Sequence, residues 1–170
     1  MADDLTFDLA FSAPPARVEQ VSPLVRRVVA GNAGPFTFRG TCTYIVGRGT
    51  VAVIDPGPAR PDHVEAIAAA LAGETVSHIV VTHTHMDHSP AVPLLAAKTG
   101  GRVVGCGPHR ASRALAAGEA SAMEGSGDFA FRPDAEMREG DAVSGPGWTL
   151  AAVAIITTGA LVLPPGRVGM

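Results

Sequence analysis

Short apolar runs and helical repeats follow one another along this chain, and together they predict its secondary structure. Residues 41–46 and 51–54 are rich in β-branched side chains and are separated by Gly47-Arg48-Gly49-Thr50. β-Branched residues suit pleated strands, and a short loop containing glycines is typical of a hairpin. The pattern predicts a β-hairpin that ends at the turn sequence Asp55-Pro56-Gly57.

A helical period replaces the strand pattern after Pro61. Apolar residues then follow the i, i+3, i+4, i+7 spacing of one helix face, at Val64, Ile67, Ala68 and Leu71. Proline suits the first helical turn, and Gly73 suits the position just past a helix end. The spacing therefore predicts an amphipathic helix that begins at Pro61.

Strands and helices continue to alternate farther along the chain. Residues 78–81 are a short β-branched run, and Ser89-Pro90 has the form of a helix N-cap and first helical residue, with Lys98 and Gly100 at the helix end. Residues 102–104 predict another strand and residues 108–117 another helix. This order indicates an α/β fold in which helices cover a sheet.

The composition divides the chain into three parts. Residues 1–35 are rich in proline and glycine, which predicts an irregular arm with one strand near residues 24–29. Residues 36–153 carry the strand and helix pattern and form the predicted domain. Residues 154–170 form an apolar tail.

Size and charge narrow the class of protein. The 170 residues are 46% hydrophobic, which is enough for one sizeable core, and the formal net charge is -3. The basic residues are spread singly, which argues against a nucleic-acid partner. The amino terminus lacks a signal-peptide pattern, and no apolar stretch reaches the roughly 18 residues of a spanning helix. We expect a soluble, cytoplasmic protein.

A cluster of histidines follows directly after the strand predicted over residues 78–81. His83, His85, Asp87 and His88 lie within six residues, and three of the six histidines in the chain are among them. Imidazole and carboxylate are the ligands that zinc takes in catalytic sites. On a helix, the His-x-His spacing would point the two rings about 200° apart, so the motif needs an extended loop. The cluster predicts a zinc site.

The sequence His83-Thr84-His85-Met86-Asp87-His88 resembles the H-x-H-x-D-H signature of the metallo-beta-lactamase-fold hydrolases. Residues 40–47 and 53–57 look like the two strands before that signature in the branch of glyoxalase II and the beta-lactamase-like protein 2 group, although Cys42 stands where that branch often has asparagine. Residues 89–91 and 105–109 fit the same branch. The resemblance covers about residues 36 to 150.

The resemblance implies an αββα sandwich with two zinc ions at the edge of its sheets. His83 and His85 would bind the first metal, and Asp87 and His88 the second. A metal-bound hydroxide would attack an acyl or phosphoryl centre, and Asp87 would position and deprotonate the water. Asp55 matches an aspartate that lies behind the metal loop and orients it, although a turn aspartate is an equal reading of this residue.

The later metal ligands of the family are absent from this sequence. No histidine follows His109, and none of the late aspartates Asp128, Asp134 and Asp141 follows a strand in a metal-loop context. A catalytic zinc normally has three protein ligands and a water. We therefore expect partial zinc occupancy at most, with only the N-terminal sheet-and-helix half of the sandwich present.

The family pattern is lost just past Val153, where a Pro-Gly-His turn is expected and the chain instead continues with the apolar tail. We take residues 154–170 as aberrant, and our hypothesis is a truncation or frameshift. A sheet without its packing partner would expose an apolar face, which predicts self-association.

Two other histidines have simpler interpretations. His109 forms a Cys-x-x-His spacing with Cys106, but a single pair of this kind is more typical of a helix start beside a buried thiol than of a metal site. We expect His63 to lie on the surface of the helix that begins at Pro61.

Three functions fit these observations. The first is a zinc-dependent hydrolase of a thioester or small ester, with a small-molecule substrate. The second is a phosphodiesterase or ribonuclease, because one fold hosts both chemistries. The third is an inactive fragment. Zinc content and chelator-sensitive ester turnover separate them.

Overall fold

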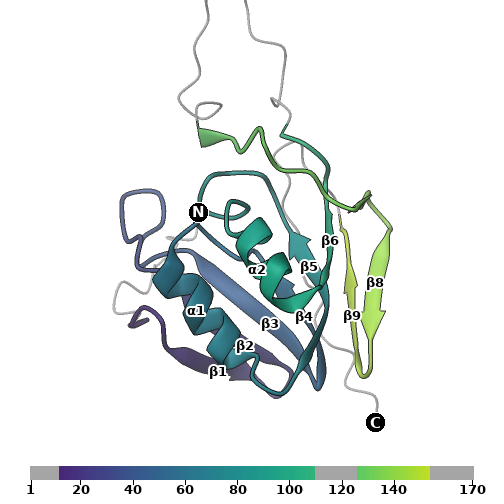
Figure 1. Cartoon of the computed structure of the whole chain (residues 1–170), viewed down its shortest axis with the longest axis horizontal. Coiled ribbons are helices and arrows are strands. Elements are labelled where there is room, and N and C mark those ends of the chain that lie inside the picture. Colours follow the sequence, from purple (N-terminus) through teal and green to yellow (C-terminus); the bar gives the residue numbers. More distant parts are fainter. Residues whose placement is uncertain (1–11, 110–125, 154–170) are drawn as a thin grey trace, which may run out of the picture.

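The computed structural model describes residues 12–109 and 126–153 and is built around a seven-stranded sheet. The strands follow one another across the sheet in sequence order, from β1 to β7 (Figure 1). Strands β1 to β4 form an antiparallel meander, whereas β4, β5, β6 and β7 run parallel. Strands β8 (Ala142–Gly145) and β9 (Trp148–Ala151) form a separate antiparallel hairpin.

The meander begins inside the segment that we expected to be irregular. Strand β1 (Val18–Ser22) pairs with β2 (Val25–Val29), and β2 pairs along its whole length with β3 (Cys42–Arg48). The single strand expected near residues 24–29 is confirmed, but the irregular arm is wrong for this part of the chain. Proline and glycine mark the turns here, and the strands between them gain their order from pairing with β3.

The hairpin and the helices expected after it are confirmed, with shifted ends. Strand β3 turns into β4 (Thr50–Ile54) at Gly49, and α1 (Pro61–Ala70) begins at the predicted proline. The parallel strands are β5 (Thr75–Val81), β6 (Arg102–Gly105) and β7 (Ala135–Glu136). Helix α2 (Val92–Thr99) ends at Gly100 as expected but starts after Pro90. Most of the helix predicted at 108–117 lies outside the described residues.

Helices α1 and α2 lie side by side on one face of the sheet (Figure 1). Alternate residues of the strands point to this face, so Ile45, Val53 and Ile79 pack against Ile67 of α1 and Leu95 of α2. All five of these side chains are fully buried. The α/β class that the sequence predicted is therefore confirmed. Among the described residues, no helix has the length and apolar character needed to cross a membrane.

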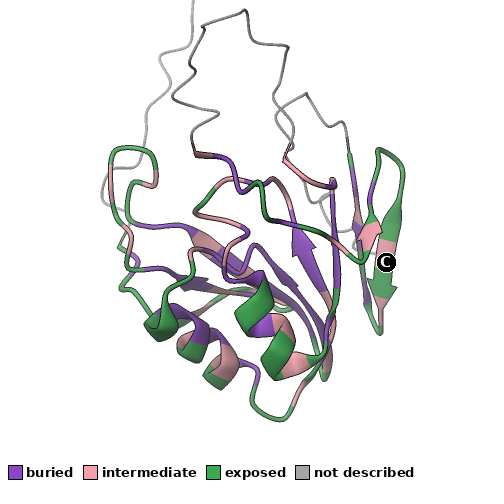
Figure 2. Ribbon diagram, turned by 45° about the horizontal axis from the view of Figure 1, so that its top comes forward, coloured by how far each residue is buried: buried purple, intermediate pink, exposed green. Residues whose placement is uncertain are grey.

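The opposite face of the sheet packs against the β8–β9 hairpin. The intervening strand residues, such as Ile54 and Val80, form a second buried cluster with Trp148 and Leu150 of β9, and Figure 2 shows the buried positions of the sheet in purple. The indole Nε1 of Trp148 also donates a hydrogen bond to the carbonyl of Thr50 at 2.9 Å. The expectation of a bare apolar face is therefore wrong for this part of the sheet, because the hairpin shields it. Self-association stays a prediction.

A substitution at Gly47 in β3 tests the packing of Trp148 against the sheet. The φ of Gly47 is +102°, and a Cβ atom there would lie 2.5 Å from Cδ1 of Trp148. We expect Gly47→Ala to lower the free energy of unfolding by about 2 kcal/mol, through backbone strain and overpacking. Gly49→Ala is the matched control, because Gly49 also has a positive φ but has no atom within 4 Å of the added carbon. Equal losses for both variants in urea unfolding would contradict the role of Trp148.

Candidate metal centre

Residues 82–89, which we call the histidine loop, leave the carboxyl end of β5 and lead into α2. Parallel sheets place their functional loops at this edge. No helix forms at His83 and His85, as the His-x-His spacing requires, and residues 86–88 make a turn in which His88 N donates to the carbonyl of His85 at 2.9 Å. Backbone hydrogen bonds join it to the turn after β4: Gly57 N donates to the carbonyl of His88 at 3.0 Å, and Ala91 N donates to the carbonyl of Gly57 at 3.1 Å.

The loop brings three imidazole rings together. The ring centroids of His83 and His88 are 4.0 Å apart, and those of His83 and His85 are 4.8 Å apart. Asp87 joins the same group, because its Oδ2 atom lies 3.2 Å from Nε2 of His88. The structure thus places all four predicted ligands in one cluster at the edge of the sheet.

A residue of the loop before β3, Thr41, hydrogen-bonds to the carboxylate of Asp87 and holds it in place. The hydroxyl of Thr41 donates to Asp87 Oδ2 at 2.8 Å, and the same hydroxyl accepts a hydrogen bond from the Asn32 side-chain amide at 3.1 Å. Asn32 Oδ1 in turn accepts from the backbone N–H of Thr41 at 2.9 Å. These contacts fix the direction in which the carboxylate of Asp87 points.

Asp55 lies behind the histidine loop, where its buried carboxylate accepts three hydrogen bonds. Oδ1 accepts from the backbone N–H of Thr82 at 2.8 Å, and Oδ2 accepts from the Thr82 hydroxyl at 2.6 Å and from Nδ1 of His88 at 2.9 Å. Asp55, His83 and His88 could also form a ligand set by distance, since their donor atoms lie within 4.8 Å of one another. Because both carboxylate oxygens are already engaged, a supporting role for Asp55 fits better than direct ligation.

The same network sets which ring nitrogens carry protons. The Thr82 hydroxyl has one hydrogen, which it donates to Asp55, so it must accept from Nδ1 of His83, 3.0 Å away. Nδ1 of His88 likewise donates to Asp55. In His83, Nε2 is then the nitrogen available to a metal. Nε2 of His88 faces Asp87 Oδ2 at 3.2 Å, and a metal bound at this nitrogen would displace that contact. Ligating histidines commonly donate their other ring N–H to a carboxylate, so this arrangement fits zinc.

The pKa values of His83 and His88 are shifted in opposite directions. Burial, with the neighbouring His88 and His85 rings, lowers the pKa of His83 to about 4, so that ring is neutral at pH 7. Burial would also lower the pKa of His88, but hydrogen bonds with Asp55 and Asp87 outweigh it and raise that pKa to about 9. Burial of Asp87 acts to raise its pKa, yet the hydrogen bonds from His88 and Thr41 hold it well below its usual value. Asp87 is thus an anion.

His63 is not the surface residue that we expected. It is 1% exposed, and its Nε2 atom lies 2.9 Å from the Thr43 hydroxyl, which donates to the backbone carbonyl of Asp55 at 2.6 Å. Because the hydroxyl hydrogen goes to Asp55, His63 must donate from Nε2. Through the Thr43 hydroxyl, His63 therefore helps to hold the turn that carries Asp55. His63 precedes Val64 by one residue and Ile67 by four, so it lies at the edge of the buried face of α1, where the turn packs over it.

The structure also brings two residues to the histidine loop that sequence reasoning set aside. Nδ1 of His109 lies 2.8 Å from the Thr84 hydroxyl, and its ring centroid is 6.1 Å from that of His85. Asp128 accepts a hydrogen bond from the Ser89 hydroxyl at 2.7 Å. Ser89 is therefore engaged with Asp128 and caps no helix, which corrects the expected start of α2. No sequence signal marked either contact, because both join distant segments.

Comparison with known proteins identifies related sequences and folds. The family model of the metallo-beta-lactamase superfamily matches residues 36–164, which is more than half of the chain. The match continues past Val153, so the resemblance does not end where we expected.

Curated relatives include thioesterases. An atrochrysone carboxyl ACP thioesterase of Aspergillus terreus is 47% identical over 79 residues, which is 45% of this chain and 25% of that protein. A lactamase-like protein of Pestalotiopsis fici is 42% identical over 86 residues, which is 48% of this chain and 28% of the relative. The matched part thus spans about a quarter of the length of these relatives.

Solved structures share the fold. BJP-1, a subclass B3 metallo-beta-lactamase of Bradyrhizobium japonicum, superposes with a TM-score of 0.61 at 19% identity, covering 86% of this chain and 55% of that chain. A metallo-beta-lactamase of Cronobacter sakazakii gives a TM-score of 0.58 at 21% identity, covering 81% and 54%. The chain therefore covers just over half of each of these structures.

Proposed function

Because this chain belongs to the metallo-beta-lactamase superfamily, we propose that it is a zinc-dependent hydrolase that cleaves a thioester or small ester. The observation that carries the proposal is the cluster of His83, His85, Asp87 and His88 on one loop, with Asp55 behind it. The curated relatives support the thioester class, since several are named as thioesterases. Placement in the branch of glyoxalase II and beta-lactamase-like protein 2 stays a prediction.

Four residues would hold zinc: His83 and His85 would bind a first ion, and Asp87 and His88 a second. The His83 ring is neutral and carries its proton on Nδ1, so Nε2 has a free lone pair, which is the state in which imidazole binds zinc. Bound zinc would supply a Lewis acid and would lower the pKa of a water molecule to near 7. The donor types, their shared loop and the carboxylate behind them fit this group.

The chain's own residues would orient the reacting groups. Asp87 is an anion fixed by Thr41, so its carboxylate can accept a hydrogen bond from an attacking water and hold that water in one direction. Asp55 fixes the ring of His88 directly at Nδ1 and that of His83 through the Thr82 hydroxyl. Asp87 is thus the proposed catalytic residue, and Asp55 a positioning residue.

The small number of metal ligands in the cluster leads us to expect low activity. All six histidines of the chain are described, and the remaining three are His63, His78 and His109. His63 supports the Asp55 turn and His109 contacts Thr84, so neither completes the cluster in this arrangement. Partial zinc occupancy and impaired turnover stay predictions, as does a cytoplasmic location.

Zinc content and thioester turnover test the proposal. The purified chain should take up zinc in equilibrium dialysis, in a stoichiometry of at most about one per chain, and lose it to a chelator. Release of thiol from an S-acyl-N-acetylcysteamine thioester should be slow and should stop after chelation. His83→Ala should remove zinc uptake, whereas His78→Ala, which changes a histidine outside the cluster, should leave it unchanged. Zinc uptake that survives His83→Ala would contradict the proposed site.

A further inference from the structure

Residues 126–128 lie along the histidine loop and bind it through the backbone. Met86 N donates to the carbonyl of Ser126 at 2.8 Å, and Asp128 N donates to the carbonyl of Thr84 at 2.6 Å. Between these two bonds, His85 and Gly127 form an isolated antiparallel bridge. The segment therefore pairs with the part of the loop that carries His85.

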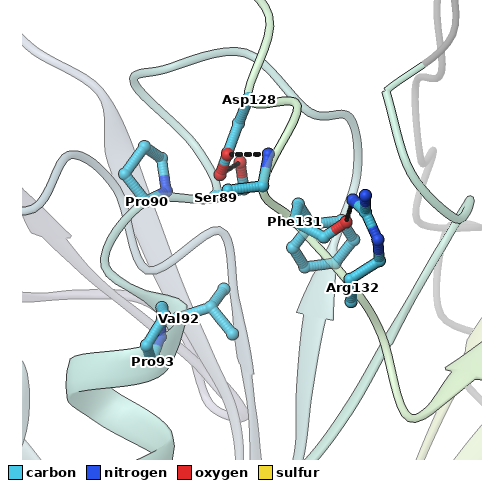
Figure 3. A pocket seen from close by; sticks show the side chains of 8 residues that line it. Ser89, Pro90, Val92, Pro93, Asp128, Phe131 and Arg132 are labelled. Carbon is cyan, nitrogen blue, oxygen red and sulfur yellow. Dashed lines mark hydrogen bonds between the residues drawn. The ribbon is translucent and has the colours of Figure 1, made fainter.

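The side chain of Asp128 adds a second attachment at the end of the loop. Its carboxylate is buried: Oδ2 accepts from the Ser89 hydroxyl at 2.7 Å, and Oδ1 accepts from the backbone N–H of Ala130 at 3.0 Å. Asp128 and Ser89 are among the residues that line a pocket of about 310 Å³. Figure 3 shows these two side chains next to each other, above Val92 and Pro93. Ser89 itself is 1% exposed, so water cannot readily replace this contact.

We propose that Asp128 is a positioning residue, which fixes the C-terminal end of the histidine loop through Ser89 and thereby sets its affinity for metal. Ser89 directly follows His88, so a displaced Ser89 would move the His88 backbone. The loop is then held by two carboxylates from different segments: Asp55 fixes ring nitrogens, and Asp128 fixes the backbone. A hydrogen bond to a carboxylate is about twice as strong as one between neutral groups, which suits this task. The effect on metal rests on the proposed zinc site.

Asp134 provides a matched control within the same segment of chain. Its Oδ2 accepts from the backbone N–H of Val103 at 2.8 Å, and its own N–H donates to the carbonyl of Val103 at 2.9 Å. Asp134 therefore combines a carboxylate acceptor with a backbone donor, as Asp128 does, but it binds β6 rather than the histidine loop. A general loss of stability would appear in variants of both residues.

The first test uses the metal-free protein and hydrogen–deuterium exchange. Asp128→Ala and Ser89→Ala should each speed exchange of the loop amides of Met86, His88 and Ser89, which are hydrogen-bonded in the structure. Asp134→Ala should leave those amides unchanged. If loop exchange is the same in all variants as in the unaltered chain, Asp128 does not hold the loop and the inference is wrong. This readout does not depend on zinc.

The second test measures zinc affinity by competition with a chromophoric chelator. Asp128→Ala should weaken zinc binding by about 10- to 100-fold, the usual effect of losing a group that orients a ligand, while Asp134→Ala should have no such effect. Combining Ser89→Ala with Asp128→Ala should add little to either change alone, because both break the same contact. Unchanged affinity in both single variants would overturn the inference and leave the proposed function standing. An unaltered chain that binds no zinc would overturn the proposed function and, with it, this effect on metal.

Discussion

Replacing Asp55 with alanine should lower zinc affinity on the order of 100-fold and the free energy of unfolding by about 3 kcal/mol. The substitution leaves the backbone N–H and hydroxyl of Thr82 and Nδ1 of His88 without their acceptor. It also puts alanine at a φ of +49°, a left-handed conformation that aspartate and asparagine tolerate better. Urea unfolding of the metal-free chain and chelator competition measure the two losses separately.

Two further variants sharpen this prediction. Asp55→Asn keeps the shape and the tolerance of positive φ, so it should retain more stability than Asp55→Ala but should still lose metal affinity. Asp62→Ala removes an exposed aspartate that pairs with Arg60 on the helix surface, and it should change neither property appreciably. If Asp55→Ala keeps the metal affinity of the unaltered chain, Asp55 does not orient the ligands.

His63 should make the fold sensitive to acid. Burial lowers its pKa from 6.5 to about 4, and its Nδ1 atom has no hydrogen-bond partner that could accept a second proton. The unfolded chain therefore binds this proton more readily than the folded chain. The contribution of His63 to stability is complete above about pH 6.5 and falls as the pH drops toward 4, reaching about 3 kcal/mol of loss.

A glutamine variant, His63→Gln, isolates this effect from the other titrating groups. The glutamine side chain keeps an N–H donor for Thr43 but cannot gain a proton in this range. The unfolding free energy of the unaltered chain should exceed that of the variant at pH 7.5, and the difference should shrink steadily down to pH 5. His88 acts in the opposite sense, since its raised pKa favours the folded state below about pH 9, but it is present in both proteins. Parallel pH profiles would show that His63 titrates normally.

The elements that the sequence predicted well are those with a strong local signal. The β3–β4 hairpin and α1 follow from β-branched runs, glycine positions and a helical period, all of which act within a few residues. The end of α2 at Gly100 follows from the ability of glycine to adopt positive φ, which is +69° there. The start of α2 was misplaced, because the hydroxyl of Ser89 is drawn away by Asp128 from 39 residues farther along the chain.

The candidate site shows the same difference between local signals, which the sequence reveals, and contacts between distant segments, which it does not. The histidine cluster was visible because its four polar residues are consecutive or nearly so, and a loop after a strand is where such groups meet. The residues around it come from elsewhere: 33 residues separate Asp55 from His88, 25 separate Thr84 from His109, and 20 separate Thr43 from His63. Spacing rules do not reach over such distances.

The sequence by itself thus determined the family, the α/β order and the chemical identity of the groups that we propose to bind metal, because short stretches of neighbouring residues carry each of these signals. Only the tertiary structure decided how those groups are held. It placed Asp55 behind the rings, buried His63 beneath the turn and brought Asp128 against Ser89. The physical reason is that a buried polar atom needs a partner, and the folded sheet determines which distant residue lies within hydrogen-bonding distance.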